Sequence, residues 1–229
     1  MMASAFSYKS VNSTNQKPSS LIGAWETSSE GKLGLWIITE KHFSITFYKS
    51  NEFLYTEGGE WKLSPDGIEL IWEYNTQNAA LVGEKKVYSL SVKGNKLTMD
   101  KIEWKKVDNG TPGKLAGAWL ITGRYNDGKL SERMPGARRT MKILSGTKFQ
   151  WIAYNVETKE FFGTGGGSYT TKDGKYTENI EFFSRDNSRV GASLQFDFKI
   201  ENGNWRHSGK SSKGDPLDEV WTKRDVLGI

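Results

Sequence analysis

The sequence predicts an all-β protein made of two tandem eight-stranded antiparallel up-and-down barrels. Three observations lead to this prediction: an aromatic content of 13% with 25 glycines, apolar side chains at every second position, and an internal repeat. Aromatic residues favour strands, and glycines favour the tight turns between them. A period of two is typical of strands with one buried face. It is clearest in two runs: Tyr88, Leu90 and Val92, and Leu194, Phe196, Phe198 and Ile200.

The repeat is marked by similar segments that occur twice in the same order. LIGAW at residues 21–25 returns as LAGAW at residues 115–119. Further matches are FLYTEGG at 53–59 with FFGTGGG at 161–167, and WKKVD at 104–108 with WTKRD at 221–225. Landmarks that recur in order indicate a duplicated domain.

The boundary between the copies falls in the turn-forming segment NGTPG at residues 109–113. We therefore expect barrel 1 over residues 21–109 and barrel 2 over residues 114–229. In the second copy, eight strands are expected near 116–123, 138–144, 148–155, 161–171, 175–183, 192–200, 204–210 and 218–224. Gly-containing hairpin turns such as Asp173-Gly174 suit consecutive antiparallel pairing, and eight strands close into a small barrel.

Residues 1–20 precede the first copy. Met1 to Ala5 contain the Ala3-Ser4-Ala5 pattern of a signal-peptide cleavage site, and Phe6 to Ser20 are polar enough to predict a disordered leader. We expect a periplasmic or secreted protein. No segment approaches the ~18 consecutive apolar residues of a transmembrane helix.

Composition argues against several kinds of partner and cofactor. The net charge of +5 comes from interspersed charges without a basic run, so nucleic acid is not an expected partner. With no cysteine and two histidines, no metal site and no cofactor are expected. Residues 163–167 (GTGGG) lack the Lys-Ser/Thr of a phosphate loop; with Gly58 and Gly59 at the matching place, they predict a β-bulge or barrel corner. The oligomeric state is left open.

Candidate site residues come from comparing the predicted interiors of the two copies. In the first copy the inward positions are all apolar: Leu33, Ile45, Ile68, Leu70, Leu97 and Met99. The matching positions of the second copy are polar or aromatic: Arg139, Trp151, Tyr176, Glu178, Trp205 and His207. Buried charges are costly unless they are paired. The polar set is therefore one of three things: a buried Arg139–Glu178 ion pair with His207 as a hydrogen-bonded neighbour, strand ends in a wet barrel mouth, or a ligand pocket with aromatic walls.

Three other polar residues are expected on outer surfaces. His42 lies beside a hairpin turn and is expected to be exposed. Glu73 and Glu181 occupy matching outward positions, where they are either solvated or involved in packing between the copies.

The Gly-x-Trp that opens each copy, followed by an eight-stranded meander, resembles the lipocalin-like (calycin) group, in particular small bacterial secreted domains without assigned function. The resemblance covers both copies. It implies that the tryptophan closes one end of the barrel under a basic side chain from the last strand. The matching pairs are Trp25 with Lys106, and Trp119 with Lys223 or Arg224. They are expected to be structural.

Three function classes follow. The first is non-enzymatic binding, inside barrel 2, of a small, partly apolar molecule with a polar or acidic end. Arg139 would meet its anionic or carbonyl group, and the tryptophans would stack on its apolar part. The second is a cell-envelope structural or interaction module without a pocket. The third is an enzyme that uses Glu178 and His207 as acid and base. No catalytic residue is assigned, because no catalytic signature is present.

Overall fold

A computed structural model describes residues 17–211 and 214–229 of the chain. The proposed signal-peptide remnant and most of the leader lie outside the described residues. The leader's last residues are ordered, because Pro18–Leu21 form the short helix α1 and Leu21 is buried. Within the described part of the chain, no helix has the length and apolar character needed to cross a membrane.

The first barrel is a nine-stranded antiparallel sheet that runs from Gly23 to Asp108. Its strands are β1 (Gly23–Ser29), β2 (Lys32–Ile38), β3 (His42–Lys49), β4 (Glu52–Ser64), β5 (Gly67–Asn75), β6 (Lys85–Tyr88), β7 (Leu90–Lys93), β8 (Lys96–Met99) and β9 (Ile102–Asp108). The short 3-10 helix η1 (Ala79–Leu81) precedes β6. β1 pairs with both β2 and β9. β6 and β7 are separated by the single residue Ser89, and they pair with β5 and β8 respectively. They form one interrupted sixth strand, which reduces the nine segments to the eight expected.

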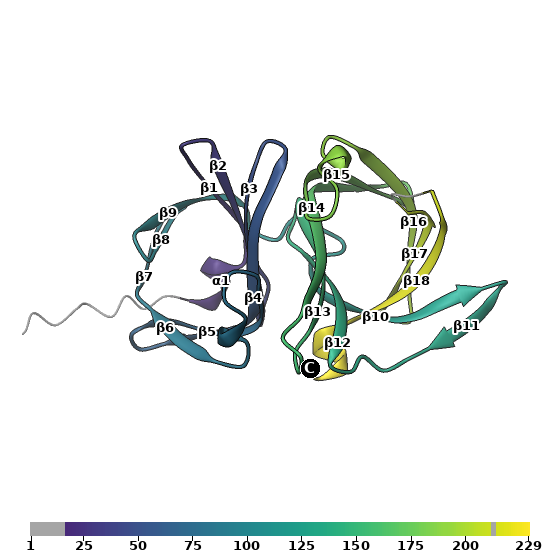
Figure 1. Cartoon of the computed structure of the whole chain (residues 1–229), viewed down its shortest axis with the longest axis horizontal. Helices are drawn as coiled ribbons and strands as arrows, with labels where there is room; N and C mark the ends of the chain where they lie inside the picture. Colours follow the sequence, from purple (N-terminus) through teal and green to yellow (C-terminus); the bar gives the residue numbers. More distant parts are fainter. Residues whose placement is uncertain (1–16, 212–213) are drawn as a thin grey trace, which may run out of the picture.

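The second barrel repeats this order. Its strands are β10 (Gly117–Asn126), β11 (Lys129–Glu132), β12 (Arg138–Leu144), β13 (Lys148–Asn155), β14 (Phe161–Lys172), β15 (Lys175–Phe183), β16 (Ser193–Glu201), β17 (Asn204–Lys210) and β18 (Pro216–Lys223). The 3-10 helix η2 (Asn187–Arg189) follows β15, and α2 (Arg224–Leu227) ends the chain. Pairing of β10 with β18 closes the barrel. Figure 1 shows the two barrels side by side.

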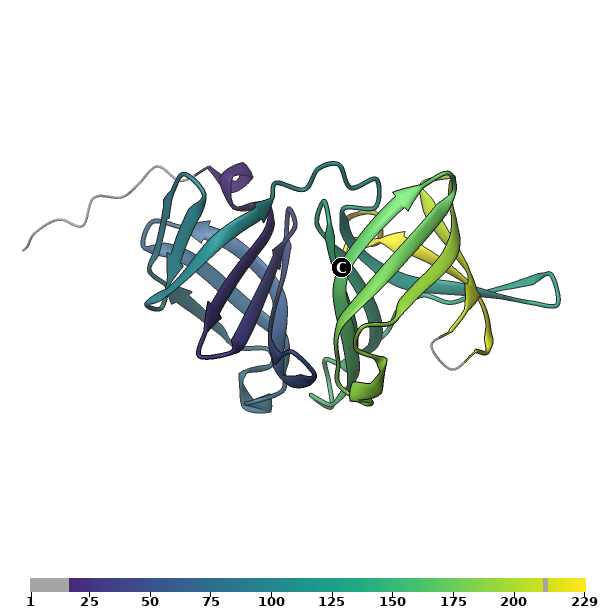
Figure 2. The same ribbon diagram turned by 90° about the horizontal axis from the view of Figure 1, so that it is seen from above.

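The sequence analysis did not predict one strand of the second copy, β11. β10 extends beyond the barrel to Asn126, and β11 pairs back only onto it, through residues 129–132. This hairpin projects from the molecule (Figures 1 and 2). Its strand β11 is exposed along its whole length, so its sequence lacks the buried alternating face that identifies the other strands.

The glycine-rich segments form the predicted β-bulges. The pairing register shifts between Gly58 and Gly59 in β4 and between Gly166 and Gly167 in β14. A Cβ at Gly166 would lie 2.5 Å from the Phe149 carbonyl oxygen and 2.5 Å from the Phe182 ring. Glycine is therefore required here for close approach of neighbouring strands and rings.

The two barrels pack face to face through a third apolar cluster, separate from the two barrel interiors. This cluster joins residues of β2, β3 and β5 to residues of β12, β13 and β15, including Leu35, Ile37, Met141, Ile143 and Ile152. The contact face of each barrel is thus apolar on the outside as well as on the inside.

The barrel–barrel contact is pseudo-twofold symmetric. Tyr48 and Tyr154 are equivalent, since each pairs with the first phenylalanine of the next strand. The Tyr48 ring contacts Phe182, and the Tyr154 ring contacts the equivalent Tyr74, with both pairs of ring centroids 4.9 Å apart. Phe53 stacks on its own equivalent, Phe161, 6.1 Å away. Each copy presents the same patch to the other, as the subunits of a twofold dimer do.

Polar groups follow the same symmetry. Gln150 accepts a hydrogen bond of 2.5 Å from its equivalent, Ser44. Its amide nitrogen lies 2.9 Å from Thr56 Oγ1 and 2.9 Å from Thr164 Oγ1, which are again equivalent residues. Every polar group of this buried centre therefore has a partner, as burial requires.

Glu73 and Glu181 lie in this contact, which settles the two alternatives in favour of packing between the copies. Glu73 accepts hydrogen bonds from Arg139, Arg224 and Tyr154. Burial raises the pKa of Glu73, but these partners lower it by more, to about 2. Its equivalent, Glu181, contacts Tyr48 and Lys148 and stays 30% exposed.

The prediction that His42 is exposed was wrong. Its side chain does point out of barrel 1, but barrel 2 covers that face, and His42 is only 4% exposed. Burial, with the nearby Arg224 charge, lowers the pKa of His42 to about 3.

Candidate functional site

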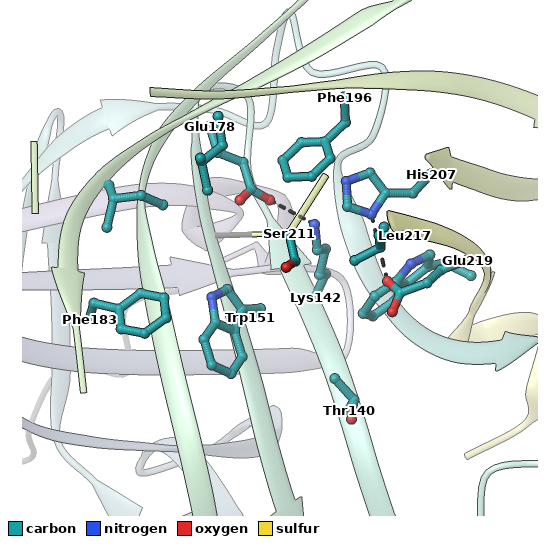
Figure 3. Close-up of a pocket in the computed structure, with 13 residues that line it drawn as sticks. Thr140, Lys142, Trp151, Glu178, Phe183, Phe196, His207, Ser211, Leu217 and Glu219 are labelled. Carbon is teal, nitrogen blue, oxygen red and sulfur yellow. Dashed lines mark hydrogen bonds and ion pairs between the residues drawn. The ribbon is translucent and has the colours of Figure 1, made fainter. Parts of the chain in front are cut away.

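The interior of barrel 2 contains a cavity of about 180 Å³. Its buried floor is formed by Lys142, Glu178, Ile180, Phe196, His207, Glu219 and Trp221. Its rim is formed by partly exposed residues: Thr140, Trp151, Phe183, Leu194, Ser211 and Leu217. Figure 3 shows how these side chains surround it. We refer to this space as the barrel-2 cavity.

A buried ion pair lies on the cavity floor. Lys142 Nζ is 2.7 Å from Glu178 Oε1, and both side chains are about 5% exposed (6% and 5%). Lys142 comes from β12 and Glu178 from β15. The two strands are separated in the sheet by β13 and β14, so closure of the barrel brings these charges together across its interior.

Four aromatic rings surround the Lys142 ammonium. Its distance to the ring centroids is 5.0 Å for Tyr176, 5.1 Å for Trp205, 5.5 Å for Trp221 and 5.7 Å for Phe196. Each ring face attracts a cation, and the effect is strongest away from water. The charge of Lys142 is therefore balanced by one carboxylate and an aromatic cage.

His207 lies beside this cage with unmet hydrogen-bonding capacity. It is 2% exposed, and neither ring nitrogen has a hydrogen-bond partner among the described residues. Nδ1 is 3.7 Å from Glu219 Oε2, which is too long for a hydrogen bond. Burial, together with the Lys142 charge, lowers the pKa of His207 to about 4. At neutral pH the ring is uncharged and offers one donor and one acceptor nitrogen.

Glu219 brings a second carboxylate to the cavity. Burial raises its pKa, but the neighbouring imidazole, Lys142 and Arg124 lower it by more, so Glu219 is ionised at neutral pH. Arg124 of β10, which stands opposite Glu219 in the sheet, reaches its Oε1 at 2.8 Å with a side chain that is 64% exposed. The other oxygen, Oε2, faces His207.

Five of the six sequence-predicted site residues do point into barrel 2: Trp151, Tyr176, Glu178, Trp205 and His207. The inward assignment of Arg139 was wrong. Arg139 points out of the barrel and binds Glu73 of barrel 1, with 2.8 Å between Nη1 and Oε1. Leu33, its equivalent in barrel 1, likewise packs in the contact between the barrels.

The sequence reasoning missed Lys142 and Glu219. The error on β12 has a physical cause: one face of β2 and of β12 lines a barrel while the other packs against the neighbouring barrel, so alternation does not show which face is inside. Comparing the strand pairings of the two barrels identifies Lys142. Trp36 pairs with Trp25 in barrel 1, and Lys142 pairs with the equivalent Trp119 in barrel 2.

At the positions equivalent to Lys142, Glu178 and His207, barrel 1 is apolar. By the same pairings, Lys142 corresponds to Trp36, Glu178 to Leu70 and His207 to Met99. All three side chains of barrel 1 belong to its buried core, where Trp36 also contacts the ring of Trp104 at 5.5 Å. One fold thus carries apolar side chains at these three positions in one copy and a polar set beside a cavity in the other.

The tryptophan–lysine pairs occur in both barrels. Lys106 Nζ lies 4.8 Å from the Trp25 ring centroid, and Lys223 Nζ lies 5.3 Å from that of Trp119. Each indole donates to the backbone four residues earlier, at Leu21 and Leu115 respectively. Of the two candidates over Trp119, Lys223 takes the position, because Arg224 turns to Glu73.

This arrangement suits recognition by hydrogen bonding and ring contact. Among the described residues, no cluster of three or more His, Asp or Glu side chains is placed to hold a metal ion.

A scan of the sequence against protein-family models found no match, and a search of curated proteins found none either.

Proposed function

We propose that the chain is a tandem lipocalin-like protein whose barrel 2 binds a small, partly apolar molecule in its interior without chemical change. The single observation that carries this proposal is His207, a buried imidazole beside a cavity. Neither of its nitrogens has a hydrogen-bond partner in the described part of the chain. An unpaired buried polar group costs roughly 1–3 kcal/mol, and a ligand that pairs with it recovers that cost.

The comparison of the two barrels supports the proposal. The fold does not require Lys142, Glu178 and His207, since barrel 1 closes with Trp36, Leu70 and Met99 in their places. A polar set that the fold does not need, gathered round a cavity with aromatic walls, is typical of a ligand site. The tryptophan–lysine pairs support the lipocalin-like assignment in both copies. Export to the periplasm or exterior remains part of the proposal.

The cavity limits the size of the ligand. At ~30 Å³ for each water molecule, the 180 Å³ of the barrel-2 cavity holds about six waters. An apolar cavity of ~150 Å³ accepts benzene. The ligand we propose is therefore a single ring, or an aliphatic chain of similar volume, with one short polar group.

The test is ligand binding by the intact protein and by a variant with the interior of barrel 1. Native mass spectrometry would detect copurified small molecules. Tryptophan fluorescence, to which the lining residues Trp151 and Trp221 contribute, would report added one-ring compounds. The triple variant Lys142→Trp, Glu178→Leu, His207→Met carries the residues of barrel 1, and we expect it to bind none of them. Its near-ultraviolet circular dichroism and melting temperature control for folding. If one-ring compounds, including those with amine, hydroxyl and carboxylate ends, leave the wild-type fluorescence and melting temperature unchanged, the proposal is wrong, and an interaction module without a pocket becomes the better account.

A further inference from the structure

We infer that the barrel-2 cavity selects ligands whose polar end is a hydrogen-bond donor, above all a primary amine in its ammonium form, over ligands that end in a carboxylate. This inference rests on the proposed function and narrows its ligand class. It replaces the acidic end predicted from the sequence, which depended on Arg139. That residue lies in the contact between the barrels and is bound to Glu73.

The charges of the cavity favour a cation. Its described lining residues include two carboxylates, Glu178 and Glu219, and one ammonium, Lys142. His207 is neutral at physiological pH. The lining residues therefore carry a net negative charge. Arg124, which is not a lining residue and is 64% exposed, pairs only with Oε1 of Glu219, and water and salt screen an exposed charge of this kind. A carboxylate placed in the cavity would be repelled by two like charges at low dielectric.

The positive charge of Lys142 is already paired within the protein. Its ammonium is bound by Glu178 at 2.7 Å and lies near four ring faces. An anionic ligand would have to compete with Glu178 for this ammonium. Glu219 Oε2 and the acceptor nitrogen of His207 have no such close donor among the described residues. The floor also holds two donors without a hydrogen-bond partner among the described residues, Trp221 Nε1 and the N–H of the neutral His207 ring. The preference for a cation over an anion therefore rests on the charges of the cavity and not on a count of free acceptors.

The walls favour the same ligand. Trp221 and Phe196 line the floor, and Trp151 and Phe183 line the rim. Aromatic faces attract an ammonium in the way that the cage attracts Lys142, and they also pack against a ring. A one-ring amine would thus place its ring between the rim aromatics and its ammonium near Glu219.

The experiment compares three probes of nearly equal size: benzylamine, benzyl alcohol and benzoate. Each is titrated into the full-length protein at pH 7.5, and binding is followed by tryptophan fluorescence and calorimetry. We expect benzylamine to bind at least tenfold more tightly than benzoate, with benzyl alcohol between them. Glu219→Gln should reduce the ratio of amine to carboxylate affinity by about fivefold or more. The control Asp218→Asn, in the same strand but paired outward with Arg206, should leave the ratio unchanged.

The outcomes separate this inference from the proposed function. If benzoate binds as tightly as benzylamine, or more tightly, the inference is overturned while ligand binding by barrel 2 stands. If none of the three probes binds, both fail. The wild-type ratio decides the inference even if Glu219→Gln does not fold.

Discussion

Lys142 occupies an interior position that is filled by a tryptophan in barrel 1. Its equivalent in barrel 1, Trp36, fills space, whereas Lys142 brings a charge that needs Glu178 and an aromatic cage. Replacing a buried ion pair by apolar residues is often neutral or stabilising, whereas removing one partner leaves an uncompensated charge. The pair therefore contributes polarity to the site rather than net stability to the fold.

The difference between removing one partner of the ion pair and replacing both gives a first prediction. Glu178→Leu, which leaves Lys142 buried without its carboxylate, should lower the free energy of unfolding by roughly 3–5 kcal/mol. The double variant Lys142→Met, Glu178→Leu should lie within about 1 kcal/mol of the wild type. Chemical denaturation of the two variants measures both values. Equal destabilisation in the single and double variants would show that the ion pair is needed for folding itself.

His207 makes stability depend on pH. Its pKa is about 4 in the folded protein and about 6.5 when unfolded, so the unfolded state binds more protons as the pH falls below 6.5. As the pH falls from 6 to 4.7, the contribution of this residue should therefore lower the free energy of unfolding by up to about 1.4 kcal/mol per pH unit. His42, with a pKa of about 3, adds a similar slope.

The measurement is the unfolding free energy at several pH values for wild type and for His207→Met, which restores the barrel 1 residue. The variant should show a smaller slope than the wild type in this window, because it loses the contribution of His207, while those of His42 and of carboxylates such as Glu73 remain. Parallel curves for the two proteins would mean that His207 is not buried in its neutral form.

At the scale of elements, the strands that face the neighbouring barrel explain why register was hard to predict. β2 and β12 bury side chains on both faces, and the strands β4 and β14 carry the bulges that bend the sheet. The sequence shows a bulge through its glycines, because side chains are excluded there. It does not show which face of a doubly buried strand lines the barrel.

The bulge in β14 gives the third prediction. Gly166→Ala should lower the free energy of unfolding by roughly 1–3 kcal/mol, the usual cost of overpacking, because its Cβ would collide with the Phe149 carbonyl and the Phe182 ring. Gly136→Ala is the matched control, since nothing lies within 4 Å of a Cβ there. Thermal and urea denaturation of both variants would test it. A Gly166 variant as stable as the control would show that β14 can relax at the bulge.

At the scale of the whole molecule, the two copies divide their roles while they share one symmetric contact. Barrel 1 has apolar residues in place of Lys142, Glu178 and His207 and supplies half of the contact surface, and barrel 2 supplies the cavity. The contact between the barrels is locally asymmetric. Glu73 forms ion pairs with two arginines, whereas the equivalent Glu181 forms one with Lys148 and is partly exposed.

The fourth prediction uses these two equivalent glutamates. Glu73→Gln should lower the free energy of unfolding by roughly 3–5 kcal/mol, since Arg224 is 1% exposed and would lose its carboxylate. Glu181→Gln, at a 30% exposed position, should cost about 1 kcal/mol or less. Denaturation followed by fluorescence measures both. Similar costs at the two positions would contradict the burial difference between them.

The sequence by itself determined the all-β class, the duplication, the eight-stranded order and the bulges, because alternation, repeated landmarks and glycines are local signals. It also selected five side chains that do enter barrel 2, through the comparison of equivalent positions. Only the tertiary structure decided that Arg139 and His42 lie in the contact between the barrels, and that Lys142 and Glu219 complete the cavity. The reason is physical: which face of a strand lines a barrel, and what covers the other face, depends on packing between segments far apart in the chain.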